Sequence, residues 1–412
     1  MKGRGSKAIV AVLATLDTKG VEVAFLRDRL REAGVQVRII DAGIMGSPTI
    51  PPDIPASLLA RKAGSSLTAI RSLGHEGQAM GRMIQGAVRV VQDLYRRGNI
   101  HGLIGLGGSM GTSLGTGVMR TLPFGFPKLM VSTMASRDTR PFVGSKDILM
   151  YHSVVDLVGL NRMTRMVLTR AAWAVAGMVQ AKDVNEPSSR SPLVAVSTLG
   201  TTEACVRHFK PDLEKAGWEM AVFHTVGSGG LALEELVEEG IPQAVIEVSL
   251  HELVDHLFKG SYDAGPYRLE ASLKKGLPTL LIPGNIDFIV SGPPESLPSR
   301  YKNRPVHVHN PAICVVRTNA QEMKRLAAWL ADRLLLANGP VALLIPTLGF
   351  SAFDSPGKPF YDLRTDQVFT ETIKKRAPKN IFVKEIAAHI NDPLFASEVS
   401  GIFNQLIRSH RS

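Results

Sequence analysis

The sequence predicts an α/β protein made of two Rossmann-like, doubly wound domains that arose by internal duplication. The first observation is a repeat, because "AVLATLDTKGVEVAFLRDRLREAGVQVRIIDAG" (11–43) aligns without gaps with "VAVSTLGTTEACVRHFKPDLEKAGWEMAVFHTV" (194–226). In each copy an apolar strand ends in Thr-Leu-x-Thr, and an amphipathic helix, Ala-Gly and a second strand follow. Each copy therefore has the length of a right-handed strand–helix–strand unit.

The second observation is that further apolar runs alternate with helical patterns along both halves. In the first half, a helix is expected at 85–98 and buried parallel strands at 100–108 and 128–133. In the second half, a helix is expected at 320–335 and buried parallel strands at 243–249, 278–284, 312–318 and 341–347.

The division between the two halves is predicted at "AKDVNEPSSRSP" (181–192), which is polar and rich in Pro and Ser. We expect a nucleotide-binding domain at 1–183 and a substrate domain at 192–412. The last segment, 391–409, has the Asp-Pro start of a closing helix, for which packing back on the first domain is one option.

The composition restricts the classes of ligand and the cellular compartment that the protein fits. The 412 residues are 44% hydrophobic, enough for two cores, and the formal charge of +11 suits an anionic ligand. Nucleic acid is disfavoured because the basic residues are scattered and aromatics are only 6%. No apolar run is long enough to span a membrane, and the two distant cysteines, Cys205 and Cys314, fit a reducing cytoplasm. The N-terminus resembles a signal peptide, but the repeat explains it better as a first strand.

Two loops after predicted strands suggest phosphate binding, because ligands of such sheets bind where the strands end. The first loop, after strand one, offers hydroxyls, a carboxylate and an ammonium group beside a helix N-terminus; its candidates are Thr15, Asp17, Thr18 and Lys19. The second is glycine-rich, and its candidates are Gly107, Gly108, Ser109, Gly111 and Thr112. It matches neither a Walker A sequence nor a strict G-x-G-x-x-G motif, so a tight strand-to-helix turn is the alternative interpretation.

A third polar loop follows the strand at 128–133. Ser132, Thr133 and Arg137 are candidate nucleotide contacts, because Arg can hold an oxyanion with two hydrogen bonds. Asp138 is a candidate catalytic residue that could orient an arginine or help hold Mg²⁺. The alternative is a solvated loop whose charges pair with one another.

Polar residues also follow the strands of the second half. Asp287 and His309 are candidate catalytic residues, since a histidine titrates near neutrality and can act as an acid or base. Candidate contacts to a small anionic substrate are Thr201, Glu203, Gly284, Asn285, Asn310, Arg317 and Ser351. Ser351 belongs to a Gly- and Pro-rich segment, 343–362, which is expected to be a loop over the substrate cleft.

No metal site is predicted from the sequence. In "HELVDH" the two histidines, His251 and His256, are five residues apart and do not match the helical H-E-x-x-H geometry.

Several motifs in order identify a resemblance. "ATLDTKG", "GLGGSMGTS", "VSTMASRDTRPFVGSKDI", "VSTLGTTE", "IPGNIDF" and "VVRTNAQEM" together resemble the Tm-1-like ATP-binding family, also called the UPF0261 family, over nearly the whole chain. The resemblance implies two Rossmann-like domains, ATP binding by the N-terminal domain and dimerisation. The chain departs from the family pattern at Met110, where a glycine is usual, and at Arg137, where the family pattern has Ala-Ser-Gly-Asp.

These inferences lead to one main hypothesis and two alternatives. The main hypothesis is a cytoplasmic, homodimeric enzyme that uses ATP, with Mg²⁺, on a small anionic substrate in the cleft between its domains, by phosphoryl or activated-acyl transfer. One alternative is a nucleotide-gated protein that binds RNA or protein without turnover. The other is an enzyme of sugar acids or nucleotide sugars that does not use ATP.

Overall fold

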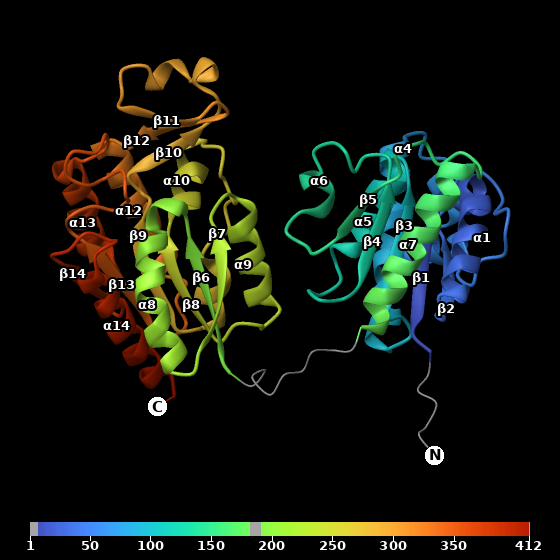
Figure 1. Ribbon diagram of the computed structural model, residues 1–412, viewed down its shortest axis with the longest axis horizontal. Coiled ribbons are helices and arrows are strands. Elements are labelled where there is room, and N and C mark those ends of the chain that lie inside the picture. The colour runs from blue at the N-terminus through green and yellow to red at the C-terminus, as the bar shows by residue number, and fades with distance from the viewer. Residues whose placement is uncertain (1–6, 182–190, 412) are drawn as a thin grey trace. The chain divides into compact units, whose positions relative to one another are not determined.

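The computed structural model describes residues 7–181 and 191–411, the side chain of Arg411 excepted, and Figure 1 shows their course. The chain divides into two compact units, Met1–Val184 and Asn185–Ser412, called the first and second units below. Of the predicted linker, residues 182–190 lie outside the described residues.

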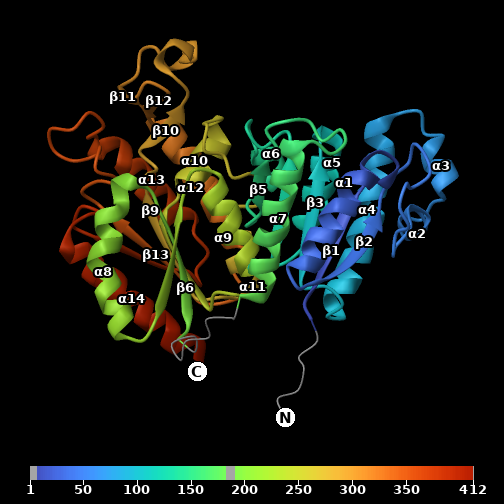
Figure 2. The same cartoon turned by 45° about the vertical axis from the view of Figure 1, so that its right-hand side comes forward.

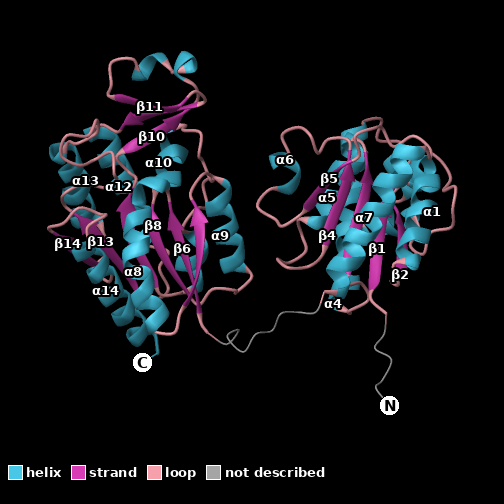
Figure 3. Cartoon of the chain, viewed as in Figure 1, coloured by secondary structure: helices cyan, strands magenta, loops and turns pink. Residues whose placement is uncertain are grey.

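The first unit is a parallel five-stranded sheet covered by helices on both faces (Figure 3). The strand order is β2-β1-β3-β4-β5. The strands are β1 (Ile9–Ala14), β2 (Gln36–Asp41), β3 (Gly102–Gly107), β4 (Lys128–Ser132) and β5 (Leu149–His152). The helices are α1 (Leu16–Glu32), α2 (Ala56–Lys62), α3 (Leu67–Arg71), α4 (Glu76–Arg96), α5 (Ser109–Met119), α6 (Arg140–Val143) and α7 (Arg162–Gln180).

Both faces of this sheet are apolar, which is why its strands read as continuous hydrophobic runs. Val10 and Val12 of β1 pack with α1 and α7, while Ala11 and Leu13 of the same strand pack with α2, α4 and α5. Alternate side chains of one strand therefore enter two different cores.

The second unit has a parallel six-stranded sheet in the order β14-β13-β9-β8-β6-β7. Its strands are β6 (Leu193–Thr198), β7 (Glu219–His224), β8 (Ala244–Ser249), β9 (Thr279–Gly284), β13 (Val341–Pro346) and β14 (Phe382–Ile386). Its α-helices are α8 (Glu203–Lys215), α9 (Ser228–Glu238), α10 (His251–Phe258), α11 (Glu270–Lys275), α12 (Ala320–Leu334), α13 (Leu363–Arg376) and α14 (Pro393–Arg411). Its 3₁₀ turns are η2 (Gly200–Thr202), η3 (Pro294–Ser296) and η4 (Ser299–Tyr301).

A small antiparallel sheet is inserted after β9. Its strands are β10 (Phe288–Ser291), β11 (Val306–Asn310) and β12 (Ile313–Arg317), in the order β10-β12-β11. In Figures 1 and 2 it lies beyond the arrowheads of the six-stranded sheet. The prediction of a parallel core strand at 312–318 is therefore wrong. The run is apolar because Val315 and Val316 of β12 enter two separate hydrophobic clusters.

The two units share one topology, which supports the predicted duplication and confirms the fold class. Numbered from its own first strand, the second sheet reads 2-1-3-4-5-6 from β7 to β14, and the first sheet reads 2-1-3-4-5. Gly34 and Gly217, which are equivalent in the sequence repeat, both have φ of +86°, a conformation that favours glycine. The closing helix α14 packs on α8, β9 and β13, so its apolar face belongs to the core of the second unit.

Candidate functional site

The strand order of the first unit defines where a ligand is expected. The order reverses at β1, which lies between β2 and β3, so the loops after β1 and β3 diverge to opposite faces of the sheet. Ligands of doubly wound sheets bind at this switch point, outside the carboxyl ends of the strands. We call the side of each sheet where the strands end its carboxyl edge.

Several glycines at the end of β3 and within α5 serve packing. A Cβ atom on Gly107 would lie 2.8 Å from the Cα of Gly111, and one on Gly115 would lie 2.7 Å from the sulfur of Met130. These glycines allow α5 to approach β3 and β4 closely, as the turn interpretation expects.

Gly108 is different, because the atom nearest to its added Cβ would be Thr133 Oγ1, at 3.8 Å. Gly108 is also the N-cap of α5, and no side chain caps this helix. The first-turn N–H groups of α5 are therefore open to a ligand beside Gly108, as the phosphate interpretation expects.

Two predicted contacts hold this loop from inside. Thr112 and Ser132 are fully buried, and their hydroxyls lie 2.7 Å apart. The Thr112 hydroxyl donates to the carbonyl of Gly108 at 2.7 Å, and Ser132 Oγ accepts from the Met134 N–H at 2.9 Å. These residues position Gly108 and Thr133, while Ser109 is exposed and Thr133 half-buried at the surface of the edge.

The loop after β1 is held by its own charged residues. Asp17 Oδ2 accepts from the N–H groups of Met45 at 2.7 Å and Gly46 at 3.1 Å. Lys19 Nζ donates to the carbonyl of Leu157, so this ammonium group ties α1 to the loop after β5. Thr15 and Thr18, whose hydroxyls lie 2.8 Å apart, line a depression of about 190 Å³ together with Asp17 and Met110.

The third predicted loop lies at the surface of the first unit. Arg137 and Asp138 are exposed, and Asp138 Oδ1 accepts from the Arg140 N–H at 3.1 Å, which forms the turn into α6. The loop follows Thr133 directly, so these charges stand on the chain segment that leaves the Gly108 surface. Their predicted roles remain predictions.

Asn285 joins the strand ends of the second unit. It is fully buried and has φ of +59°. Its side-chain nitrogen donates to the Thr201 hydroxyl, and its side-chain oxygen accepts from the Thr202 hydroxyl at 3.0 Å. Its main-chain oxygen lies 3.0 Å from His251 Nδ1. Asn285 therefore positions Thr201 and does not itself face a ligand.

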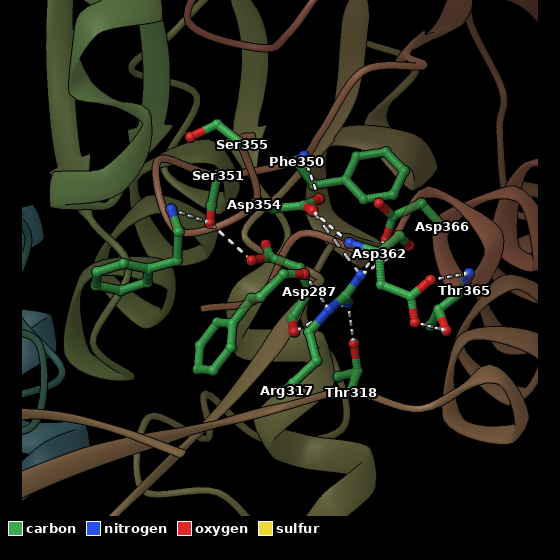
Figure 4. A network of polar contacts seen from close by, with 12 residues as sticks. Asp287, Arg317, Thr318, Phe350, Ser351, Asp354, Ser355, Asp362, Thr365 and Asp366 are labelled. Atoms are coloured by element: carbon green, nitrogen blue, oxygen red, sulfur yellow. Dashed lines mark hydrogen bonds and ion pairs between the residues drawn. The ribbon is translucent and has the colours of Figure 1, made fainter. Parts of the chain in front are cut away.

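Figure 4 shows a buried cluster of charged groups around Arg317, which is 4% exposed. Its guanidinium donates to Asp366 at 2.6 Å and to the main-chain oxygens of Phe360 at 2.7 Å and Asp287 at 3.1 Å. Asp354 lies 4.0 Å from the same guanidinium. The Ser351 hydroxyl donates to Asp287 Oδ2 at 2.7 Å.

The carboxyl groups of this cluster hold protons more tightly than usual. Burial, together with the charge of Asp354, raises the pKa of Asp287 to about 7 against the opposing effect of Arg317. Burial raises the pKa of Asp366 to about 9, although Arg317 opposes the rise. Asp287 Oδ1 and Asp366 Oδ2 are buried without a hydrogen-bond partner among the described residues, as fits carboxyl groups that carry protons.

These contacts give three of the predicted site residues partners within the protein. Asp287 and Ser351 are fully buried and Arg317 nearly so, and each already has protein partners. Most of the segment 343–362 is a loop between β13 and α13, as predicted, and it packs onto the second unit with Phe350, Ser351 and Asp354 fully buried. Direct contact of these three residues with a substrate is therefore not supported.

Other predicted substrate residues are dispersed. A Cβ atom on Gly284 would lie 2.1 Å from the Val248 carbonyl oxygen, so this glycine serves packing. Glu203 is exposed and lies 3.8 Å from Arg207, and Asn310 Oδ1 accepts from the Ala312 N–H at 2.9 Å to close a turn. Of the predicted set, Thr201 and His309 line one pocket in the second unit, with a volume of about 140 Å³.

Sequence reasoning missed two residues, one at each carboxyl edge. Asp41, at the end of β2, accepts from the N–H groups of Leu16 at 3.0 Å and Gly43 at 2.8 Å, and burial raises its pKa. His224, at the end of β7, lines the second-unit pocket. The repeat aligns Asp41 with His224, so comparing its two copies at their second strand ends would have found both.

The described residues, 7–181 and 191–411, contain neither a membrane-spanning helix nor a cluster of metal ligands. No helix in these ranges is both long and apolar enough to cross a bilayer. No group of three or more His, Cys, Asp or Glu residues there is placed to hold a metal ion.

Comparison with known proteins identifies relatives of both units. Residues 8–184 match the model described as "Uncharacterised protein family (UPF0261) N-terminal domain", and residues 191–407 match its C-terminal domain. A UPF0261 protein of Clostridium tetani is 37% identical over 388 residues, covering 94% of this chain and 96% of the relative.

Two further similarities are more limited. The ToMV susceptible protein tm-1 of Solanum lycopersicum is 32% identical over 421 residues, which cover 96% of this chain and 55% of the relative, so this chain spans about half of it. The structure of UDP-GlcNAc 2-epimerase from Methanocaldococcus jannaschii aligns over 95% of this chain and 92% of that chain, with 12% identity and a TM-score of 0.24.

Proposed function

The chain belongs to the UPF0261 family, and from that premise we propose that its first unit binds ATP at the carboxyl edge of its sheet, beside Gly108. One observation carries the proposal. The helix N-terminus at the switch point is uncapped, and the glycine that begins it is the one with free space in that loop. The backbone N–H groups of Ser109, Met110 and Gly111 would hold phosphate oxygens, and Thr133 would add a hydroxyl.

The space at this edge suits a nucleotide. The depression of about 190 Å³ beside Thr15 and Thr18 adjoins a second of about 310 Å³, and both are lined by Ile44, Met45 and Glu76. Together they reach the range of roughly 300–1,000 Å³ that small-molecule sites occupy.

Magnesium would accompany the nucleotide. Mg²⁺ in nucleotide sites is held by one or two carboxylates together with phosphate oxygens, and it neutralises phosphate charge. Asp17 Oδ1 is buried without a hydrogen-bond partner among the described residues, and Asp17 lines the smaller depression. Asp17 therefore fits as a ligand, and the exposed Asp138 is the second candidate.

Nucleotide binding has more support than turnover. The predicted catalytic residue Asp287 is enclosed with Ser351 and Arg317, whereas the surface at Gly108 is open. The homodimer and the cytoplasmic location stay predictions.

Titration calorimetry of the full chain with Mg-ATP tests the proposal. Gly108→Val is expected to weaken binding at least about thirtyfold, because the side chain fills the space that phosphate needs. The variant should still fold, since Gly108 has φ of −77° and ψ of −155°, which valine adopts readily.

Gly177→Val is the matched control. Gly177 is an exposed glycine of α7 with nothing within 4 Å of an added Cβ, and it lies near the end of a helix that leaves the carboxyl edge. This variant should bind Mg-ATP like the unaltered chain. Unaltered affinity in Gly108→Val, or no binding by the unaltered chain, would contradict the proposal.

A further inference from the structure

The second unit contains a small pocket between its main sheet and the inserted antiparallel sheet. Thr201 follows β6 and His224 ends β7, and both line the pocket from the carboxyl edge. Phe288 of β10 and His309 of β11 line it from the inserted sheet, and Phe353 lines it from the segment after β13. β6 is the switch-point strand of this unit, so the pocket occupies the position where a doubly wound sheet binds its ligand.

The pocket walls combine aromatic rings with the aliphatic side chains of Leu199, Val290, Ile313 and Val315. Phe288 and Phe353 meet edge to face, with ring centroids 5.7 Å apart. The ring centroid of His251 lies 4.7 Å from that of Phe288, and the ring centroid of His307 lies 4.7 Å from that of Phe353. The volume of about 140 Å³ is close to the roughly 150 Å³ of an engineered cavity that binds benzene. One six-membered ring therefore fits between these walls.

The polar groups of the pocket are hydrogen-bond donors. The Thr201 hydroxyl accepts from the side-chain nitrogen of Asn285, so its own hydrogen is left to donate. The imidazoles of His224 and His309 are exposed at the rim and can each donate through an N–H group. Among the described residues that line the pocket, none carries a carboxylate. An anionic acceptor would therefore find donors here without a repelling charge.

From this arrangement we propose that the second unit binds a monocyclic aromatic carboxylate, of the benzoate or nicotinate type. The ring packs against Phe288 and Phe353, and the carboxylate accepts from Thr201 and from His309. This site is independent of the nucleotide proposal, because all its residues belong to the second unit and its occupation needs no nucleotide.

Titration of the full chain with benzoate, in the absence of nucleotide, tests the inference. Two matched probes separate the two features of the ligand. Cyclohexanecarboxylate keeps the charge without the aromatic ring, and benzyl alcohol keeps the ring without the charge. Each is expected to bind at least about tenfold more weakly than benzoate. Equal binding of either probe, or no binding of benzoate at about 5 mM, would overturn the inference.

Variants locate the site. Ile313→Trp places an indole in the pocket and should abolish benzoate binding, whereas Val308→Trp, on the same hairpin but 53% exposed and outside the lining, should not change it. His309→Ala alters an exposed side chain, so the protein should fold, and binding should weaken about fivefold to tenfold.

Unchanged benzoate affinity in both Ile313→Trp and His309→Ala would overturn the inference. Should Ile313→Trp not fold, His309→Ala alone decides, and unchanged affinity there overturns it. Gly108→Val should retain full benzoate binding, which separates failure of this site from failure of the nucleotide site.

Discussion

The two units have the same strand order, but the carboxyl edge of the first is exposed and that of the second is largely buried. In the first unit the edge is a surface of backbone N–H groups and hydroxyls, formed by Gly108, Thr15 and Thr18. In the second unit the segment between β13 and α13 folds onto the strand ends and buries Asp354 with Asp287 and Arg317. The comparison shows that one duplicated framework can leave its switch point open at the surface, as at Gly108, or enclose most of it, as around Arg317.

The largest effect is expected from breaking the enclosed edge. Arg317→Met removes the cation that three buried carboxyl groups surround, so the second unit should lose about 3–5 kcal/mol of unfolding free energy. Calorimetric unfolding of the full chain would show this as an earlier transition of the second unit, with that of the first unit unchanged.

Arg207→Met is the control for this change. Arg207 has a 71% exposed side chain, 3.8 Å from Glu203, and its loss should shift neither transition measurably. Equal effects of the two substitutions would show that the cluster does not hold the edge together.

A smaller effect is expected in how the stability of the second unit depends on pH. The pKa values of Asp287 and Asp366 are raised to about 7 and about 9 in the folded protein, so from about pH 4 upward folded molecules keep protons that unfolded molecules lose. Stability of the second unit should therefore fall as pH rises toward 9. Asp366→Asn mimics the protonated acid and should recover up to about 2 kcal/mol of the loss between pH 7 and 9.

Thermal unfolding measured across this pH range checks the expectation, with the exposed Asp332→Asn of α12 as control. A decline of the same size in Asp366→Asn and in the unaltered chain would contradict the assignment of the decline to Asp366.

The smallest effect distinguishes two neighbouring glycines at the open edge. Gly107→Ala forces a Cβ to 2.8 Å from the Gly111 Cα and should cost about 1–2 kcal/mol of unfolding free energy. Gly108→Ala meets only Thr133 Oγ1, at 3.8 Å, and should change stability by less than about 0.5 kcal/mol. Denaturant unfolding of both variants measures the difference. A larger loss in Gly108→Ala would mean that the space beside Gly108 is not free.

The sequence predicts the framework because buried parallel strands are continuous apolar runs, and β8, β9 and β13 were located this way. The same pattern misassigned β12, since an antiparallel strand between two apolar clusters looks identical. The positions of the strand ends also indicated where polar residues lie. The burial of Asp287, Arg317 and Ser351 could not be predicted, because it depends on hydrogen bonds between residues far apart in the sequence. Ser351 and Asp287 are 64 residues apart, and Arg317 and Asp366 are 49 residues apart.

Hydrogen–deuterium exchange of the full chain with and without saturating Mg-ATP tests most directly the claim that the open edge is the nucleotide site. Slower exchange is predicted in peptides that cover 106–113 and 132–140, where the first-turn N–H groups of α5 and the loop after β4 would meet the nucleotide. Peptides that cover Asp287 and Arg317 should exchange at unchanged rates, because their edge is already enclosed. Protection confined to the second unit, or none at 106–113, would contradict the claim.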